Sequence, residues 1–200
     1  RLPLYILAGL SLQSCVKLDQ EPFNDLSEQN SFLSVEDAQY WINGMYDGLR
    51  ENTYGNAMYS TDIQADFLNA VRRNNEVLPE LHRWTNFTSS NGTTAAIWMA
   101  YYKAIQDINV ALKGIPNVPI SKERERVERA QIQRNLGELY LGRAYYYTYL
   151  ITHFCGAYDA SSTYGLPILR EFKVSNFPAP STLKETYEFI LEDIARAQQL

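Results

Sequence analysis

The feature that most constrains the fold is one long helical segment, from Lys122 to about Phe154, whose apolar residues lie on more than one side. Its stretch GRAYYYTYL, Gly142 to Leu150, contains four tyrosines within five positions. At helical spacing Tyr147 joins the main apolar stripe, whereas Tyr145 and Tyr149 line a second side. A helix that is apolar on more than one side is buried among other helices. The sequence therefore predicts a bundle around this segment, with tyrosines that pack between helices and do not form a ligand platform.

An arginine interrupts the apolar stripe of this segment. Arg143 lies among the tyrosines, and a buried guanidinium is costly unless a carboxylate or carbonyl pairs with it. Trp41 and Trp98 fall on the apolar faces of two other predicted helices, which favours packing over ligand contact. We therefore expect structural roles for Trp41, Trp98, Arg143 and Tyr147.

Three further long segments keep a helical period. They begin at Ser34, Ala95 and Thr182, and a shorter helix is predicted over Tyr59 to Ala70. Ser34 can cap the first helix, while Thr182 and Glu185 form a T-x-x-E capping box at the last. The pattern predicts an all-α fold: an α-superhelix of tetratricopeptide-like helix pairs with long irregular loops. It contains no strict 34-residue repeat.

The first fifteen residues, RLPLYILAGLSLQSC, combine one basic residue with an apolar run that ends near a cysteine. At about 11 residues the run is too short to span a bilayer and is typical of a secretory signal. LQSC resembles a bacterial lipobox, with Cys15 as the lipidated residue; the alternative is an ordinary signal with a cysteine near the cleavage point. We predict a signal peptide over residues 1–14, a lipidated Cys15 with an extended arm over 15–33, and a helical domain over 34–200 that lacks its C-terminal part.

Composition excludes several classes of function. A net charge of −5 argues against a nucleic-acid partner, since phosphate binding needs clustered Lys and Arg. His153 and Cys155 could suggest a metal, but His82 is the only other histidine and there is no CxxC or HExxH spacing. No metal site and no cofactor are predicted.

Several segments, in order, resemble the N-terminal portion of SusD/RagB-type (SusD-like) outer-membrane lipoproteins of the Bacteroidetes. The resemblance begins with the lipobox and LDQEP, and it is strongest in GELYLGRAYYYTYLITHFCGAYDASSTYGLPIL. That segment is similar to the family pattern A-E-A-x-F-L-R-A-Y-x-Y-F-x-L-x-x-x-Y-G-x-x-P-L. The segment STLKETYEFILEDIARA also matches the family at Ser181, Glu185, Tyr187, Ile190, Asp193 and Ala197. Gly137, Gly142 and Cys155 depart from the pattern, at positions that concern packing.

The resemblance implies a non-enzymatic, cell-surface lipoprotein, lipid-anchored in the outer membrane. Such a protein binds an oligosaccharide or polysaccharide and passes it to a SusC-like TonB-dependent transporter. Sugar recognition needs flat apolar faces together with amide or carboxylate groups for the hydroxyls. The aperiodic stretch HRWTNFTSSNGTT supplies both, so Trp84, Asn86, Phe87 and Asn91 are the candidate glycan contacts.

Other functions remain open at this point. One is a tetratricopeptide-like scaffold lipoprotein that binds a protein partner and no sugar, and another is uptake of a non-glycan nutrient such as a peptide. A glycoside hydrolase would need two carboxylates on either side of its substrate. Asp62 and Asp66 are four residues apart on one predicted helix, which places them on the same side.

Overall fold

The computed structural model describes residues 30–69, 79–85, 88, 91–173 and 178–200. Residues 1–31 and 32–200 form two separate units, and the fold concerns the second. Cys15 and the predicted signal peptide therefore lie outside the described residues, as do Asn86 and Phe87.

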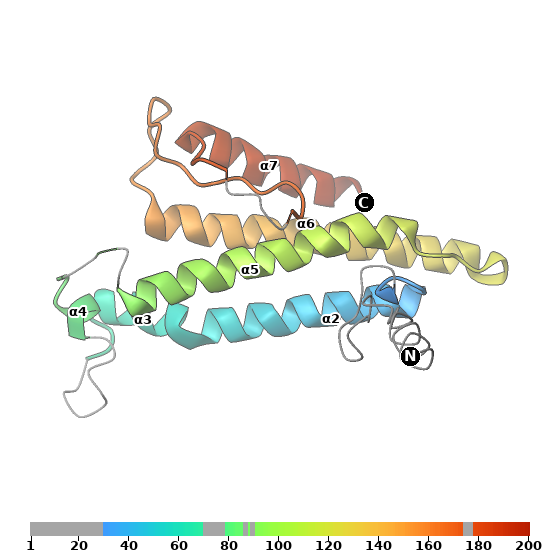
Figure 1. The fold of residues 1–200 in the computed structure, drawn as a ribbon, viewed down its shortest axis with the longest axis horizontal. Helices are drawn as coiled ribbons and strands as arrows, with labels where there is room; N and C mark the ends of the chain where they lie inside the picture. The colour runs from blue at the N-terminus through green and yellow to red at the C-terminus, as the bar shows by residue number, and fades with distance from the viewer. Residues whose placement is uncertain (1–29, 70–78, 86–87, 89–90, 174–177) are drawn as a thin grey trace, which may run out of the picture. The chain divides into compact units, whose positions relative to one another are not determined.

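The second unit is built from helices (Figure 1). Their bounds are α2 (Val35–Asn52), η2 (Thr53–Ala57), α3 (Met58–Gln64), α4 (Pro79–His82), α5 (Gly92–Gly114), η3 (Ile115–Asn117), η4 (Lys122–Arg124), α6 (Glu125–Phe154) and α7 (Leu183–Gln199). No strand occurs in the parts of the chain that the structure describes. The predicted all-α fold is confirmed.

Side-chain caps explain where three of the helices begin. Ser34 Oγ accepts a hydrogen bond from the Asp37 N–H at the start of α2, at 3.1 Å. Thr182 and Glu185 exchange bonds of 2.8 and 3.1 Å at the start of α7, which is the predicted capping box. Asn91 caps α5, so this helix begins at Gly92 and not at Ala95 as predicted. Each cap satisfies an N–H that has no partner within its own helix.

The predicted helix over Tyr59 to Ala70 is too long at its C-terminal end. Helix α3 stops at Gln64 because Asp66 adopts a left-handed backbone, with φ of 60°. The N–H groups of Phe67 and Leu68 then bond back to the Asp62 carbonyl, at 2.9 and 3.2 Å. The chain leaves the helix here.

Helix α6 lies between α2, α5 and α7, as predicted for a segment that is apolar on more than one side. Side-chain hydrogen bonds link it to α2, η2 and α3, and in one of them Asn52 Nδ2 donates to the Tyr146 hydroxyl at 3.3 Å, across 94 positions. Four further bonds each join residues 92 positions apart. The pairs are Gln39 with Gln131, Thr53 with Tyr145, Ala57 with Tyr149, and Thr61 with His153. The constant separation means that the two segments run parallel and in register.

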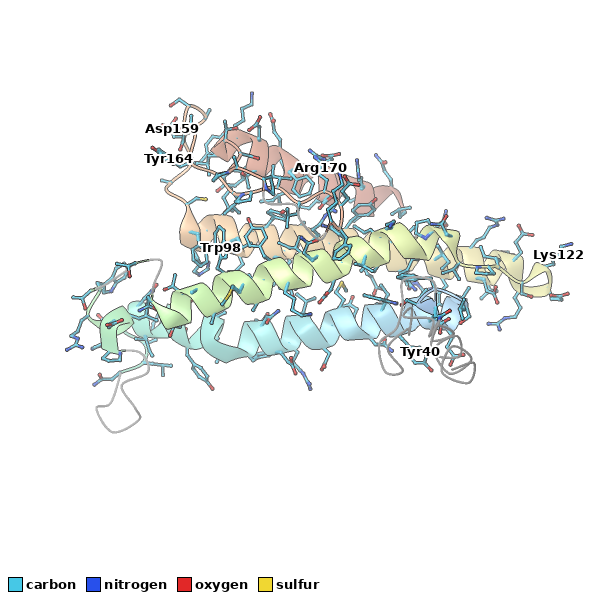
Figure 2. The ribbon with its side chains drawn as sticks, in the orientation of Figure 1. Tyr40, Trp98, Lys122, Asp159, Tyr164 and Arg170 are labelled. Carbon is cyan, nitrogen blue, oxygen red and sulfur yellow. The ribbon has the colours of Figure 1, made fainter. Side chains whose placement is uncertain are left out.

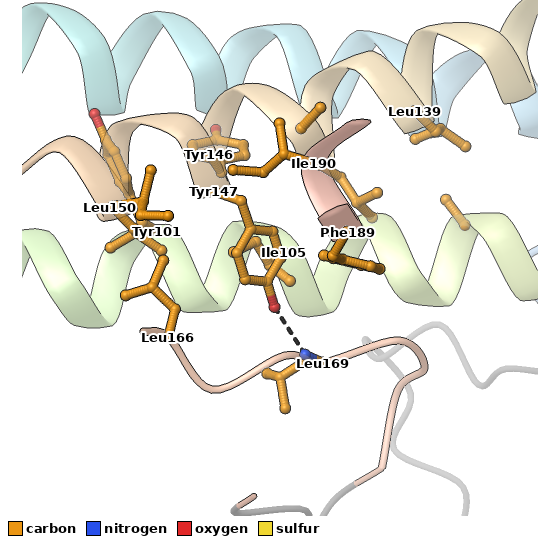
Figure 3. Packing of buried hydrophobic residues seen from close by; sticks show 14 of the residues in the cluster. Tyr101, Ile105, Leu139, Tyr146, Tyr147, Leu150, Leu166, Leu169, Phe189 and Ile190 are labelled. Carbon is orange, nitrogen blue, oxygen red and sulfur yellow. Dashed lines mark hydrogen bonds between the residues drawn. The ribbon is translucent and has the colours of Figure 1, made fainter. Parts of the chain in front are cut away.

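The tyrosines of α6 hold non-helical backbone on two sides. Between α2 and α3 the π-helical turn η2 departs from helical geometry at Gly55 (φ −89°, ψ −138°). The Tyr145 hydroxyl bonds to the Thr53 hydroxyl in this turn, and the Tyr149 hydroxyl donates to the Ala57 carbonyl. On the other side, the Tyr147 hydroxyl accepts the Leu169 N–H at 2.7 Å (Figure 3). Tyr147 is fully buried, and burial raises the pKa of its hydroxyl to about 12.

Arg143 is buried at the meeting point of three helices. Its guanidinium donates two bonds of 2.7 Å to the Asp193 carboxylate on α7 and one of 2.6 Å to Asn109 Oδ1 on α5. It also donates to the Arg170 carbonyl, at 3.3 Å. Asp193 and Arg170 thus supply the carboxylate and carbonyl that the sequence analysis required, and Asp193 is fully buried as well.

The two tryptophans on helical faces pack against other rings. Trp41 stacks on Phe32 with ring centroids 5.2 Å apart. Trp98 contacts Tyr102 and Phe154, at 4.8 and 5.1 Å, between α5 and α6 (Figure 2). Both are partly buried against the core.

The Arg143–Asp193 pair should dominate the stability of the bundle. Asp193→Ala leaves a buried guanidinium without its carboxylate, so the free energy of unfolding should fall by about 3–5 kcal/mol in urea denaturation. The control is Asp47→Ala, which removes an equally short 2.7 Å pair with Arg50 whose side chains are 59% and 69% exposed. That change should cost about 1 kcal/mol or less. Equal losses in the two variants would contradict this assignment.

Gly165 should tolerate no side chain. A Cβ there would lie 2.4 Å from the Thr182 carbonyl oxygen and 2.5 Å from Thr186 Oγ1. Gly165→Ala should therefore lower the free energy of unfolding by about 1–3 kcal/mol, as overpacking does. Gly44→Ala is the control, because nothing lies within 4 Å of its Cβ, and it should raise helix stability by up to about 1 kcal/mol. A thermal melt in which Gly44→Ala has the lower melting temperature of the two variants would refute the close approach of Gly165 to the start of α7.

Candidate ligand-binding site

The candidate site lies where α3, α4, the N-terminal part of α5 and the C-terminal part of α6 come together. Its first component is Trp84, just after α4. The Trp84 side chain is 65% exposed, and its indole N–H donates to the Gln64 carbonyl at 3.1 Å. The bond fixes one edge of the ring to the end of α3 while much of the ring stays accessible to solvent.

The backbone at Trp84 is unusual for its residue type. Its φ of 53° is in the left-handed region, which a bulky aromatic residue rarely adopts. Backbone bonds from Trp84 N to Leu81 O and from Thr85 N to Glu80 O, at 3.2 and 2.9 Å, hold the turn. Residues kept in such conformations cluster at ligand-binding and active sites, because the surrounding structure has to impose them.

A cavity of about 610 Å³ lies beside this tether. Its walls are largely apolar and include Leu81, Ile97, Trp98, Met99 and Phe154. Its polar lining comes from Ser60, Gln64, His153 and three threonines. This volume is in the range of small-molecule sites, which are mostly apolar with a few polar groups that fix orientation. Gln64 takes part in both components, because its carbonyl holds Trp84 and its side of α3 lines the cavity.

One wall of the cavity is a stacked pair of rings. Tyr149 and His153 lie parallel, with centroids 3.8 Å apart and an interplanar angle of 12°. His153 Nδ1 contacts the Tyr149 carbonyl at 2.8 Å, and Nε2 lies 3.3 Å from Thr61 Oγ1. Burial raises the pKa of the Tyr149 hydroxyl, and this hydroxyl donates to the Ala57 carbonyl at 3.2 Å.

Asn91, a predicted glycan contact, has a structural role at the start of α5. Its Oδ1 accepts the Thr94 N–H at 3.1 Å, and its Nδ2 donates to Glu80 Oε2 at 2.7 Å. A contact with sugar would have to share or replace one of these bonds. Asn91 thus links Glu80 on α4 to the first turn of α5.

Sequence reasoning did not predict the cavity. Its lining residues come from α3, α4, Thr88, α5 and α6, and no periodicity reveals how these segments lie relative to one another. The one available signal was the lack of any period around Trp84.

A second hollow of about 500 Å³ lies between α2 and α6. Its rim carries Tyr46, Tyr54 and Tyr145, with Arg50 and Glu138 beside them. Burial and a hydrogen bond to Glu138 raise the pKa of Tyr46. Tyrosine and arginine are enriched at protein interfaces, so this surface suits a protein partner better than the first cavity does.

The described residues hold no cluster of three or more His, Cys, Asp or Glu that could bind a metal ion. Within the same residues, no helix has the length and apolar character needed to cross a bilayer.

A family described as SusD-like, "Starch-binding associating with outer membrane", matches residues 18–200. The chain belongs to this family. The resemblance stated from the sequence motifs is therefore confirmed.

Relatives of this SusD-like chain agree in sequence and in fold. It is 24% identical over 195 residues to SusD-like protein P38 of Formosa agariphila, a match that covers 94% of this chain and 34% of the relative. A SusD superfamily protein of Bacteroides thetaiotaomicron superposes with a TM-score of 0.67 at 20% identity, over 84% of this chain and 37% of that one. A SusD-like carbohydrate binding protein of Bacteroides vulgatus gives 0.67 at 20% identity, over 84% and 36%. The SusD-like chain thus spans about a third of the length of these proteins.

Removing the exposed ring of Trp84 should lower the free energy of unfolding much less than removing the ring of Trp98, which lines the cavity. Trp84→Ala should change the free energy of unfolding by about 1 kcal/mol or less, since most of the residue is already in water. Trp98→Ala removes packing against Tyr102 and Phe154 and should cost about 2 kcal/mol or more. Urea denaturation measures both, and a larger loss for Trp84→Ala would mean that the Trp84 ring belongs to the core.

Proposed function

We propose that this SusD-like chain binds glycans at the Trp84 site, as part of a lipoprotein on the cell surface. In the proposal, lipidated Cys15 anchors the protein in the outer membrane, and bound oligosaccharide passes to a SusC-like TonB-dependent transporter. The protein acts as a binding protein and not as an enzyme. The family description and the name of the Bacteroides vulgatus relative both support a carbohydrate ligand.

The observation that carries the proposal is the fixed, accessible indole of Trp84 beside an apolar cavity. A sugar ring presents C–H groups that stack on an aromatic face and hydroxyls that need hydrogen-bond partners. Trp84 offers the face, and Ser60, Gln64 and the threonines of the cavity offer the partners. Because the indole is already held by Gln64, less side-chain freedom is lost when a ligand binds.

The hydrolase alternative gains no support from the placement of the two carboxylates. Asp62 lies on α3, whereas Asp66 lies beyond its end, 83% exposed and 3.8 Å from His82. A glycosidase needs two carboxyl groups about 5–10 Å apart across a substrate, one of them with a raised pKa. Neither Asp62 nor Asp66 is buried.

Calorimetry of the intact protein against a panel of oligosaccharides, with starch fragments first, tests the proposal. Trp84→Ala should weaken binding by about tenfold or more, since an aromatic contact face contributes about 1.5–3 kcal/mol. The control is Tyr164→Ala, because Tyr164 is also exposed, at 82%, but lies on the loop between α6 and α7 (Figure 2). This control variant should bind like the wild type.

Three outcomes would count against the proposal. Release of reducing sugar would favour an enzyme, and equal binding by the Trp84 and Tyr164 variants would move the site elsewhere. Absence of binding to every glycan, together with co-purification of a partner that Tyr54→Ala on the α2–α6 hollow disrupts, would favour the protein scaffold.

A further inference from the structure

The segment that leads to the Trp84 site is not a smooth helix. Helix α2 passes into the π-helical turn η2, where Gly55 has non-helical dihedral angles, and only then does α3 begin (Figure 1). The two sides of this break nevertheless keep the same register with α6. Something must therefore hold α3 in place beyond the break, because the helix geometry itself is interrupted.

Hydrogen bonds to the Ala57 carbonyl keep the start of α3 in place. Three hydroxyl groups converge on this oxygen: Ser60 Oγ at 2.9 Å, Thr61 Oγ1 at 3.0 Å and Tyr149 at 3.2 Å. Ser60 and Thr61 belong to α3 itself, so they move with it. Tyr149 comes from α6, and its bond to Ala57 ties the start of α3 to the centre of the bundle, next to the 3.3 Å contact between Thr61 Oγ1 and His153 Nε2.

The other end of α3 holds the indole of Trp84. Gln64 is the last residue of α3, and its carbonyl accepts the indole N–H of Trp84 at 3.1 Å. Helix α3 is only about two turns long. A displacement of its start at Ala57 therefore also displaces Gln64 at its end. Ser60, Gln64 and Tyr149 also line the cavity, which places the tie and the site on the same wall.

We infer that Tyr149 is a positioning residue for the Trp84 site, acting through the Ala57 carbonyl and α3. Its ring serves packing, through Tyr101 and His153, but its hydroxyl sets where α3 presents Gln64 and hence where the indole lies. The effect on ligand binding rests on the proposed function, whereas the effect on the indole does not.

Tyr149→Phe isolates the hydroxyl because it keeps the ring. The test uses the intact protein labelled with 5-fluorotryptophan, with the Trp84 fluorine resonance assigned by its loss in Trp84→Phe. Tyr149→Phe should shift or broaden the Trp84 resonance without ligand, while the Trp41 resonance stays in place. The melting temperature should change little, because Ser60 and Thr61 still satisfy the Ala57 carbonyl.

Tyr145→Phe is the matched control. Its hydroxyl, four residues earlier on α6, bonds to Thr53 at 3.0 Å, which lies before Gly55 and not on α3. This variant should leave the Trp84 resonance where it is in the wild type. An unchanged Trp84 resonance in Tyr149→Phe, or an equal shift in Tyr145→Phe, would overturn the inference. General loss of stability with shifts of all tryptophan resonances would also overturn it, because Tyr149 would then be a packing residue only.

Calorimetry with a glycan that binds the wild type gives the second readout. Tyr149→Phe should weaken binding about three- to tenfold, as expected for one lost hydrogen bond that acts on the site, and Tyr145→Phe should not. If Trp84→Ala leaves glycan binding intact, the proposed function fails, yet the fluorine experiment still decides whether Tyr149 positions Trp84. Unaltered affinity in Tyr149→Phe, alongside loss of affinity in Trp84→Ala, would overturn the inference and leave the proposed function standing.

Discussion

Arg143 and Asp193 place two opposite charges where water does not reach, so the segments around them have to keep the pair together. The guanidinium meets α7 through Asp193, α5 through Asn109 and the irregular chain before α7 through the Arg170 carbonyl. A buried charge of this kind is strongly destabilising when its partner is lost. The pair therefore fixes how α5, α6 and α7 are arranged, and α6 then serves as the frame for α2 and α3.

The tyrosines of α6 extend this frame to backbone that is not helical. Buried polar backbone needs partners, and both η2 and the segment near Leu169 leave the regular hydrogen-bond ladder. Tyrosine can reach such groups because it joins a large apolar ring to a terminal hydroxyl. The tyrosine cluster is thus part of the framework, as the sequence predicts. The proposed ligand site lies at one end of it, where Tyr149 lines the cavity and holds the start of the short helix α3.

Prediction from sequence succeeded where local chemistry determines structure. The caps at Ser34 and Thr182 followed from residue type, and the need of Arg143 for a carboxylate or carbonyl followed from the cost of burying charge. The identity of the partner did not follow, because Asp193 lies 50 residues away and no periodicity relates the two. Trp84 could be singled out because its surroundings lack a helical period, but its tether to Gln64 and the cavity depend on contacts between distant segments.

The central claim is that ligand recognition is located at the end of the bundle formed by α3, α4 and the start of α5. Hydrogen–deuterium exchange of the intact protein, with and without a bound oligosaccharide, tests it most directly, since backbone amides that a ligand covers or rigidifies exchange more slowly. The account predicts slower exchange in peptides covering residues 60–68 and 79–99, with no change in α7 at residues 183–199. Protection confined to α7 or to the α2–α6 hollow, with none around Trp84, would contradict it.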